Sequence, residues 1–360
     1  MNLQRGAVHV LLQELFETPS VTAADPRDEG FYMPAEWQEH SCCWMAWPCR
    51  EGVWANAEAT QQAYANVANA IARFEPVKML APAHRLDEAR ARLASGIEVI
   101  EMPIDDSWTR DSGPNFLVND HGALAGSSWR FNAWGGKYEP YDQDARMGRR
   151  ILELAGVRAY TSEMIAEGGG ITVDGEGTVI TTESCFLNAN RNPAWSKAGV
   201  SAELCRTLGV GKVIWIPGDP DESVTDGHVD GIAAFIEPGR VLVEINPDRS
   251  DPHYPVGQRN LDALKHQTDA KGRGLELDFI AEGVYHPGVW NGGCSSYINS
   301  YLANGAVIVP GYGYDRDAVA VETYRRLYPE REIVQVQIND IAVGGGGIHC
   351  ITQQQPRRRA

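Results

Sequence analysis

The chain reads ITVDGEGTVI over residues 171–180, two runs of β-branched residues that flank a turn. Asp-Gly between such runs is typical of a β-hairpin, because glycine adopts the positive φ angle that a tight turn requires. A helix is expected next, over residues 194–208, and an apolar run at residues 213–216 indicates a strand. This stretch therefore predicts a ββαβ unit: a hairpin, a helix and a further strand.

The same order of elements recurs before and after this stretch. Three further units are expected, each a hairpin followed by a helix and a strand. Their elements are 116–131, 142–154 and 157–160; 231–245, 258–270 and 275–279; and 296–309, 317–327 and 333–336.

The two ends of the chain together supply the parts of a fifth unit. Residues 348–352 are expected to form a last strand, and nothing follows it that could complete its unit. Near the other end, a helix at 64–74 and a strand at 77–80 lack a hairpin, and a further helix and strand reach Met102. We therefore expect an α/β fold, a five-bladed propeller of ββαβ units with pseudo-fivefold symmetry, which leaves few exposed sheet edges. An open α/β sheet is the alternative.

The domain organisation follows from this repeat. Residues 1–30 are expected to be an N-terminal extension, residues 31–355 a single domain whose last blade is closed by both termini, and residues 356–360 a basic tail.

Composition excludes several classes of protein. The net charge of −16 argues against nucleic-acid binding and is compatible with attraction of a small cation. No apolar run has the length of a membrane span. Seven cysteines, an odd number without metal-finger spacing, favour unpaired thiols in a reducing cytoplasm.

Reactive side chains occupy similar places in successive units. Just before or at the first strand of each unit stand Asp111, Glu167, His228, Cys294 and Cys350. Equivalent positions of a closed ring meet near its axis, so we expect these residues to converge on one site.

Cys350 is the candidate nucleophile, because it ends the run GGGGIHC at residues 344–350, where glycines allow a ligand to approach. His228 could carry protons, and Asp230, two residues along an expected strand, would point to the same face and accept paired bonds from a guanidinium. Two alternatives remain open. Cys350 could be an inert buried thiol, and His228 and Asp230 could hold a metal with Asp226 and Glu167.

The remaining candidates surround this pair. Asp111, before a Ser-Gly-Pro turn, could clamp a guanidinium, and Trp108 could lie against the alkyl chain or cation of a substrate. Glu167 precedes three glycines and could orient the histidine or touch the guanidinium. Cys294 has no evident task, and His349, expected on a strand beside Cys350, should face the other way.

Taken in order, these motifs resemble those of agmatine deiminases, within the guanidine-modifying superfamily of five-bladed propellers that also contains arginine deiminases. The resemblance covers nearly the whole chain. The matching motifs are GFYMPAEW at 30–37, WMAWP at 44–48, DSWTRDSGP at 106–114, FNAWGGKY at 131–138, EGG at 167–169, LNANRNP at 187–193, DGHVD at 226–230 and GGGIHCIT at 345–352. Two departures are Gly231, where relatives often carry Asn, and the unusual run HSCC at 40–43.

The resemblance implies roles for the candidate residues. It implies Cys350 as nucleophile, His228 as general acid and base, Asp111 and Asp230 as guanidinium-binding carboxylates, and Glu167 as a support for histidine and substrate. The segment around Trp108 resembles the part that flanks agmatine.

The implied reaction is hydrolysis of agmatine to N-carbamoylputrescine and ammonia through a covalent amidino-thioether on Cys350, without metal or organic cofactor. The expected partner is therefore a small cationic guanidine, with no nucleic acid or membrane, and a homo-oligomer is left open. The alternatives are a deiminase or amidinotransferase acting on arginine or another guanidine, and a non-catalytic polyamine-binding propeller. A zinc hydrolase would differ from all of these in losing activity to a chelator.

Overall fold

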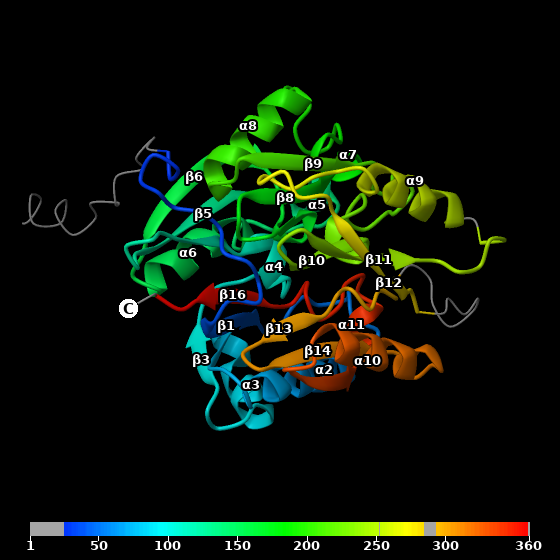
Figure 1. Ribbon diagram of the computed structural model, residues 1–360. Coiled ribbons are helices and arrows are strands. Elements are labelled where there is room, and N and C mark those ends of the chain that lie inside the picture. Colours follow the sequence, from blue (N-terminus) through cyan, green and yellow to red (C-terminus); the bar gives the residue numbers. More distant parts are fainter. Residues whose placement is uncertain (1–24, 252, 284–292, 359–360) are drawn as a thin grey trace, which may run out of the picture.

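The computed structural model describes residues 25–251, 253–283 and 293–358 (Figure 1). It contains five separate small sheets rather than one continuous sheet. Four of them have three strands, the first two antiparallel and the last two parallel. These four sheets are β4 (Asn115–Val118), β5 (Leu124–Arg130) and β6 (Arg158–Ile165); β7 (Ile171–Val173), β8 (Thr178–Thr182) and β9 (Lys212–Ile216); β10 (Ala233–Glu237), β11 (Arg240–Ile245) and β12 (Glu276–Ala281); and β13 (Tyr301–Ala303), β14 (Ala306–Gly311) and β15 (Glu332–Gln337).

The hairpin from which the prediction started is confirmed. Strands β7 and β8 pair through the turn at Asp174 and Gly175, whose φ of +69° is readily adopted only by glycine. The Asp174 carboxylate accepts hydrogen bonds from the backbone N–H groups of Glu176 and Thr178, both at 2.8 Å. The turn is therefore specified by its own residues.

A helix connects the second and third strands of each unit. These helices are α6 (Met147–Leu154), α8 (Lys197–Leu208), α9 (Tyr254–Leu264), α10 (Arg316–Leu327) and α2 (Ala57–Ile71). Four of them pack against the last strand of the preceding sheet: α8 on β6, α9 on β9, α10 on β12 and α2 on β15. Figure 1 accordingly shows α8, α9, α10 and α2 towards the outside of the molecule.

The fifth sheet combines both ends of the described chain, in the order β16 (Gln353–Pro356), β1 (His40–Ala46), β2 (Val77–Ala81) and β3 (Glu98–Glu101). Helix α3 (Leu86–Arg92) precedes its last strand. Strand β1 was not expected from the sequence. Nearly all of its residues are buried, so it lacks the alternation of polar and apolar residues that identifies a half-buried strand.

Short helical turns precede the first strand of most sheets, and they position the site. They are α4 (Thr109–Ser112) before β4, η3 (Gly168–Gly170) before β7, and η4 (Val229–Gly231) before β10. The other short helices are η1 (Ala83–Arg85), α5 (Ala133–Gly136), η2 (Asp144–Arg146), α7 (Glu183–Phe186) and α11 (Asn339–Ala342). Since α4 packs on η3 and η3 packs on η4, these turns lie together.

Several expected boundaries are wrong. Residues 348–352 form a turn, in which the Thr352 hydroxyl donates to the carbonyl oxygen of Ile348 at 2.9 Å, and the strand starts only at Gln353. Residues 228–230 enter a 3₁₀ turn rather than a strand.

Two other predicted elements are displaced or shortened. Residues 296–300 form no strand, so the hairpin expected at 296–309 is shorter. The helix expected at 258–270 lies at α9, where Pro255 stands in the first turn, a position that proline favours.

The core is built where helices meet sheets. Its largest apolar cluster contains fully buried side chains of α2, β2 and β14, among them Tyr64, Met79 and Ile308. This cluster joins the N-terminal elements to the unit that precedes the C-terminal strand.

Both chain ends extend past the described residues. Most of the expected extension, residues 1–24, lies outside them, and so do residues 359–360 of the expected tail. Arg357, just after β16, pairs with Glu39. Every helix in the described ranges is too short or too polar to cross a lipid bilayer.

Candidate active site

The structure brings five of the candidate residues into one buried cluster. Asp111 lies in α4, Glu167 directly before η3, and His228 directly before η4, which contains Asp230. Cys350 lies in the turn before β16.

Gly169 shows how closely three of these side chains approach. A Cβ atom at this position would lie 2.6 Å from Nδ1 of His228, 2.8 Å from Oδ1 of Asp111 and 2.9 Å from Oδ2 of Asp230. Each distance is well inside van der Waals contact, so any side chain at 169 would displace a neighbour. Glycine is therefore required there because an imidazole and two carboxylates surround it.

Cys350 is held by Asn299. The Asn299 amide donates from Nδ2 to Sγ of Cys350 at 3.2 Å, and its Oδ1 accepts from the Cys350 backbone N–H at 3.3 Å. The sulfur also lies 3.6 Å from Oδ2 of Asp230. These contacts fix the thiol at a place where two cavities meet, since Cys350 lines both of them.

The charge around Cys350 opposes its ionisation. Burial raises the pKa of the thiol, and the carboxylates of Asp230 and Asp111 raise it further, to well above its usual value. A thiolate would become favourable in this cluster once a cation lies between the sulfur and the carboxylates.

Asp111 is oriented by two donors. Its Oδ1 accepts the backbone N–H of Gly169 at 3.0 Å, and its Oδ2 accepts the indole N–H of Trp134 at 2.9 Å. Burial raises the pKa of Asp111, and the charges of Asp230 and Glu167 also raise it, although the neighbouring His228 lowers it. The positive charge near Asp111 therefore does not fully offset the effects of burial and of the neighbouring carboxylates on its pKa.

Asp230 is paired with a histidine that was expected to face away. Nδ1 of His349 lies 2.9 Å from Oδ2 of Asp230, and its Nε2 lies 2.8 Å from Oε1 of Glu36. The prediction for His349 is wrong, because residue 349 lies in a turn, where neighbouring side chains do not alternate between faces. Burial raises the pKa of Asp230, but the hydrogen bond and charge of His349, together with the charges of His228 and Arg110, outweigh this effect and lower the pKa.

Glu36 favours the charged form of this histidine. Burial raises the pKa of Glu36, but the charges of His349 and Arg110 outweigh it and bring the pKa to about 2. Burial lowers the pKa of His349, yet Glu36 and Asp230 together raise it. The hydrogen-bonded row of Glu36, His349 and Asp230 ends beside the sulfur of Cys350.

His228 lies between two carboxylates without a close bond to either. Its Nδ1 is 3.8 Å from Oδ1 of Asp111, and its Nε2 is 3.5 Å from Oε2 of Glu167. Neither ring nitrogen makes a hydrogen bond to any residue that the structure describes. Burial lowers the pKa of His228, but the charge of Asp111, followed by Cys185, raises it to well above the usual value.

Glu167 is anchored from behind by Arg191. The guanidinium donates from Nε to Oε1 of Glu167 at 2.7 Å, and neither side chain is exposed. Burial raises the pKa of Glu167, but Arg191 and His228 together outweigh it, so the pKa is lowered. A charged Glu167 can therefore stabilise an imidazolium at residue 228.

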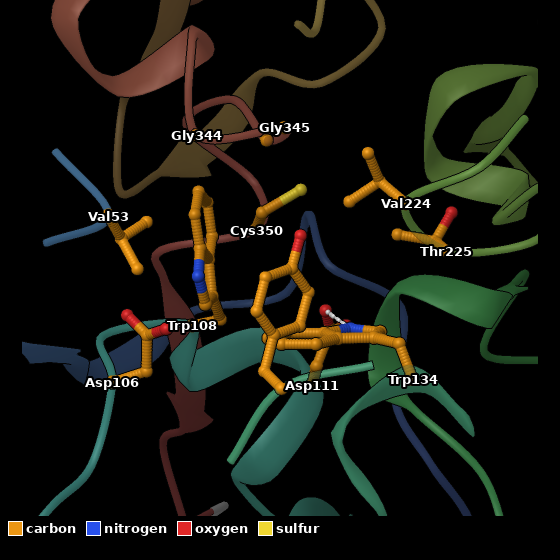
Figure 2. A pocket seen from close by; sticks show the side chains of 12 residues that line it. Val53, Asp106, Trp108, Asp111, Trp134, Val224, Thr225, Gly344, Gly345 and Cys350 are labelled. Carbon is orange, nitrogen blue, oxygen red and sulfur yellow. Dashed lines mark hydrogen bonds between the residues drawn. The ribbon is translucent and has the colours of Figure 1, made fainter. Parts of the chain in front are cut away.

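A narrow cavity leads to Cys350 (Figure 2). The cavity is small, with a volume of about 20 Å³. Figure 2 shows the ring of Trp108 along one wall and the Cys350 sulfur pointing into the space. Trp134 lies across the base, joined to Asp111 by its hydrogen bond. The cavity thus joins two aromatic side chains to the Asp111 carboxylate and the Cys350 sulfur.

Two other residues named from the sequence lie apart from this arrangement. Cys294 lines the larger cavity, and its sulfur is 3.8 Å from the hydroxyl of Tyr312. Asp226, the fourth member of the alternative metal set, contacts Arg191 at 2.8 Å and Lys137 at 2.9 Å. Its oxygens are thus already neutralised by protein cations.

Sequence reasoning missed several residues of the site. Asn299, His349, Cys185, Trp134 and Arg191 contact the candidate residues but were given no role. Trp134 and Arg191 lie inside quoted motifs, so the motifs were the available signal. Nothing in the local sequence distinguishes Asn299 or Cys185 from ordinary buried residues.

Comparison with known proteins gives one consistent result. The model of the family described as Porphyromonas-type peptidyl-arginine deiminase matches residues 32–356. The chain is 44% identical over 361 residues to the agmatine deiminase of Pseudomonas aeruginosa (strain LESB58), covering 93% of this chain and 98% of the relative. It is 43% identical over 358 residues to that of Stutzerimonas stutzeri (strain A1501), covering 92% and 97%. A solved structure of agmatine deiminase from Enterococcus faecalis aligns with a TM-score of 0.92 at 37% identity, covering 95% of this chain and all of that one.

Proposed function

The chain belongs to the Porphyromonas-type peptidyl-arginine deiminase family, and from this premise we propose that it hydrolyses agmatine to N-carbamoylputrescine and ammonia. The observation that carries the proposal is the convergence of Cys350, His228 and three carboxylates at the end of a narrow aromatic cavity. A thiol, a proton carrier and acceptors for a flat cation are the groups that this reaction requires.

In the first half of the reaction, the guanidinium lies between Asp111 and Asp230, each accepting N–H groups. The Cys350 thiolate attacks the central carbon and forms a C–S bond. His228 gives its proton to one terminal nitrogen, whose bond to carbon breaks, and ammonia leaves. An amidino-thioether on Cys350 remains.

In the second half, His228 is neutral and takes a proton from water as the oxygen bonds to the same carbon. The C–S bond then breaks and its electron pair returns to the sulfur of Cys350, which takes the hydroxyl proton and becomes a neutral thiol again, while the carbon keeps the new oxygen as a carbonyl. The product is a substituted urea, and His228 is again protonated. Glu167, fixed by Arg191, holds this imidazole and stabilises its charged form.

Binding of the cationic substrate favours formation of the Cys350 thiolate. Because two carboxylates and burial keep the pKa of Cys350 high, the thiol of the free enzyme is neutral. A bound guanidinium cancels the field of those carboxylates, so the thiol loses its proton to solvent only when the reacting carbon is in place.

The lining of the narrow cavity favours agmatine over arginine. The α-carboxylate of arginine would need a cationic partner in the protein, whereas agmatine has no α-carboxylate. Among the described residues that line this cavity, none is Lys or Arg. Lys137, whose Nζ donates to the carbonyl oxygen of Val224, is already paired with Asp226.

Rates with a set of guanidine substrates test this function. We expect ammonia release from agmatine with a kcat/KM at least about 100-fold above the values for free arginine and for a peptide containing arginine, about 3 kcal/mol of discrimination. The carbon product should be N-carbamoylputrescine. Equal or faster turnover of arginine or the peptide would reject agmatine as the preferred substrate. If none of the three compounds released ammonia, the proposal of catalysis would be rejected in favour of a polyamine-binding protein.

Asp230→Asn is expected to change two properties of Cys350 in opposite directions. Loss of a charge that raises the pKa of the thiol lowers that pKa, and each unit increases the thiolate fraction at neutral pH about tenfold. Alkylation of Cys350 by iodoacetamide should therefore become several-fold faster, while agmatine turnover falls by about 10²-fold or more through loss of guanidinium positioning. Asp262→Asn, on the exposed surface of α9, is the control for both rates. Slower alkylation of the Asp230 variant would contradict the proposed electrostatics.

We further propose that the five sheets are blades of a propeller with pseudo-fivefold symmetry, closed by both chain ends. Support comes from the packing of four of the five unit helices on the last strand of the preceding sheet, which includes α2 on β15. We also propose the cytoplasm as its location, since all seven cysteines are free thiols.

A further inference from the structure

A second buried cysteine lies behind the proposed proton carrier. Cys185 belongs to α7, and its sulfur is 3.6 Å from Oε2 of Glu167. The same oxygen is 3.5 Å from Nε2 of His228. The sulfur, nitrogen and oxygen atoms all lie within 4.8 Å of one another. The proposed reaction gives Cys185 no task.

The spacing of these three atoms suits a tetrahedral metal ion. Zinc binds thiolate sulfur at about 2.3 Å and imidazole nitrogen or carboxylate oxygen at about 2.0–2.2 Å. Two ligand atoms of a regular tetrahedron with these bonds are roughly 3.3–3.6 Å apart. The two measured separations, 3.5 Å and 3.6 Å, require little movement to match.

The imidazole supplies a separate sign of a missing ligand. His228 is only 5% exposed, yet its Nε2 makes no hydrogen bond to any described residue, which is costly for a buried polar atom. That nitrogen points at the oxygen of Glu167 beside Cys185. The other oxygen of Glu167 accepts the Arg191 guanidinium, so the carboxylate is held in place with one oxygen directed at this space.

The local charge also accommodates a dication. Arg191 is the nearest protein cation, and its charge is shared between Glu167 and Asp226, at 2.7 Å and 2.8 Å. Asp111 lies on the opposite side of the imidazole, 3.8 Å from Nδ1. The carboxylates of Glu167 and Asp111 thus flank His228, and the Cys185 thiol adds a further negative charge when a divalent ion displaces its proton.

We propose that Glu167, Cys185 and His228 form an inhibitory site for a thiophilic divalent cation such as Zn²⁺. On binding, the Cys185 thiol and the His228 imidazolium each release one proton to solvent, and their lone pairs bind the metal. Water occupies the fourth position. A metal-bound Nε2 cannot exchange a proton with substrate or water, so the reaction stops. The inhibition rests on the proposed function, whereas the binding does not.

The site has an entrance and a pH dependence. His228 lines the larger cavity, whereas Cys185 and Glu167 are fully buried behind it, so the ion must pass the imidazole and inhibition should develop slowly. Because binding releases two protons, affinity should increase with pH.

The experiment measures binding without relying on activity. Metal-free Cys350→Ala protein, which lacks the nucleophile that could itself bind zinc, is titrated with Zn²⁺ against a chromophoric chelator, and with Co²⁺ to record thiolate-to-cobalt absorption. We expect one Zn²⁺ per chain and a cobalt–thiolate band. Adding Cys185→Ala should weaken binding at least about 100-fold and remove the band, because one of three protein ligands is lost. Adding Cys294→Ala, a cysteine of the larger cavity, should change neither.

The same variants with Cys350 intact then report on inhibition. Zn²⁺ should slow agmatine hydrolysis by the unmodified chain and by Cys294→Ala, and its effect on Cys185→Ala and Cys185→Ser, relative to each variant's own rate, should be at least about 100-fold weaker. Equal binding with and without Cys185, or no binding to the Cys350→Ala protein, would overturn the site. Full zinc inhibition of both Cys185 variants would overturn the claim that metal binding at this site stops the reaction. If no protein hydrolyses agmatine, the proposed function fails while the titration still decides the metal site.

Discussion

Cys350→Ala abolishes agmatine hydrolysis, with an expected loss in kcat of at least about 10⁴-fold, because no other group can form the covalent intermediate. Its sulfur lies at the inner end of the narrow cavity, beside Asp230 and held by Asn299. Asp111 and Asp230, the carboxylates proposed to bind the guanidinium, remain in this variant. Agmatine should therefore still bind, with a dissociation constant within about tenfold of the KM of the unmodified enzyme, as calorimetry would measure.

The control is Cys205→Ala, a partly buried cysteine on α8 that lines neither of the cavities that Cys350 lines. It should retain the rate of the unmodified chain. Turnover by Cys350→Ala within tenfold of that rate would remove Cys350 from the mechanism and leave no alternative thiol with the same surroundings.

His228→Asn is expected to reduce kcat by about 10³–10⁴-fold, because one imidazole serves both halves of the reaction. Asparagine fills part of the same space but cannot exchange protons. Since Glu167 and Asp111 lie 3.5 Å and 3.8 Å from the ring, neither is positioned to replace it without movement. Stopped-flow ammonia detection should show no rapid first turnover.

The matched control is His253→Asn, a solvent-exposed histidine near Asp219 on the rim of the larger cavity. It should leave the rate unchanged. A first turnover of normal speed in His228→Asn, followed by a slow steady state, would contradict the role in ammonia departure and restrict His228 to water activation.

The elements that could be predicted from the sequence are those specified by neighbouring residues. The hairpin of β7 and β8 contains its own turn signal, with Asp174 accepting two backbone N–H groups. Helix α8 starts after the N-cap Ser196 and ends at Gly209, which adopts the left-handed conformation. Residues next to the helix therefore specify both of its ends. Such signals predicted most of the four internal units to within a few residues.

Elements that depend on remote partners were not predictable in the same way. Strand β1 pairs with β16 from the other end of the chain, and its residues are buried on both faces, so no local period identifies it. Residues 348–352 have the composition of a strand but form a turn, because Thr352 bonds back to Ile348.

The residues of the site likewise divide into those that the sequence could predict and those that it could not. Place in the repeat was enough to name Asp111, Glu167, His228 and Cys350 together, since each stands before a first strand. Their partners could not be inferred from spacing. Asn299 lies in a segment that forms no strand, and His349 was assigned to the wrong face by the strand assumed there.

Intact-mass spectrometry of enzyme quenched in acid within the first turnovers tests the central claim most directly. The account predicts a fraction of chains heavier by the mass of agmatine less ammonia, with the addition located on the peptide that contains Cys350 and absent from Cys350→Ala. It should disappear as agmatine is exhausted. Steady hydrolysis without such an adduct at any time point, or an adduct on Cys294 instead, would contradict covalent catalysis by Cys350.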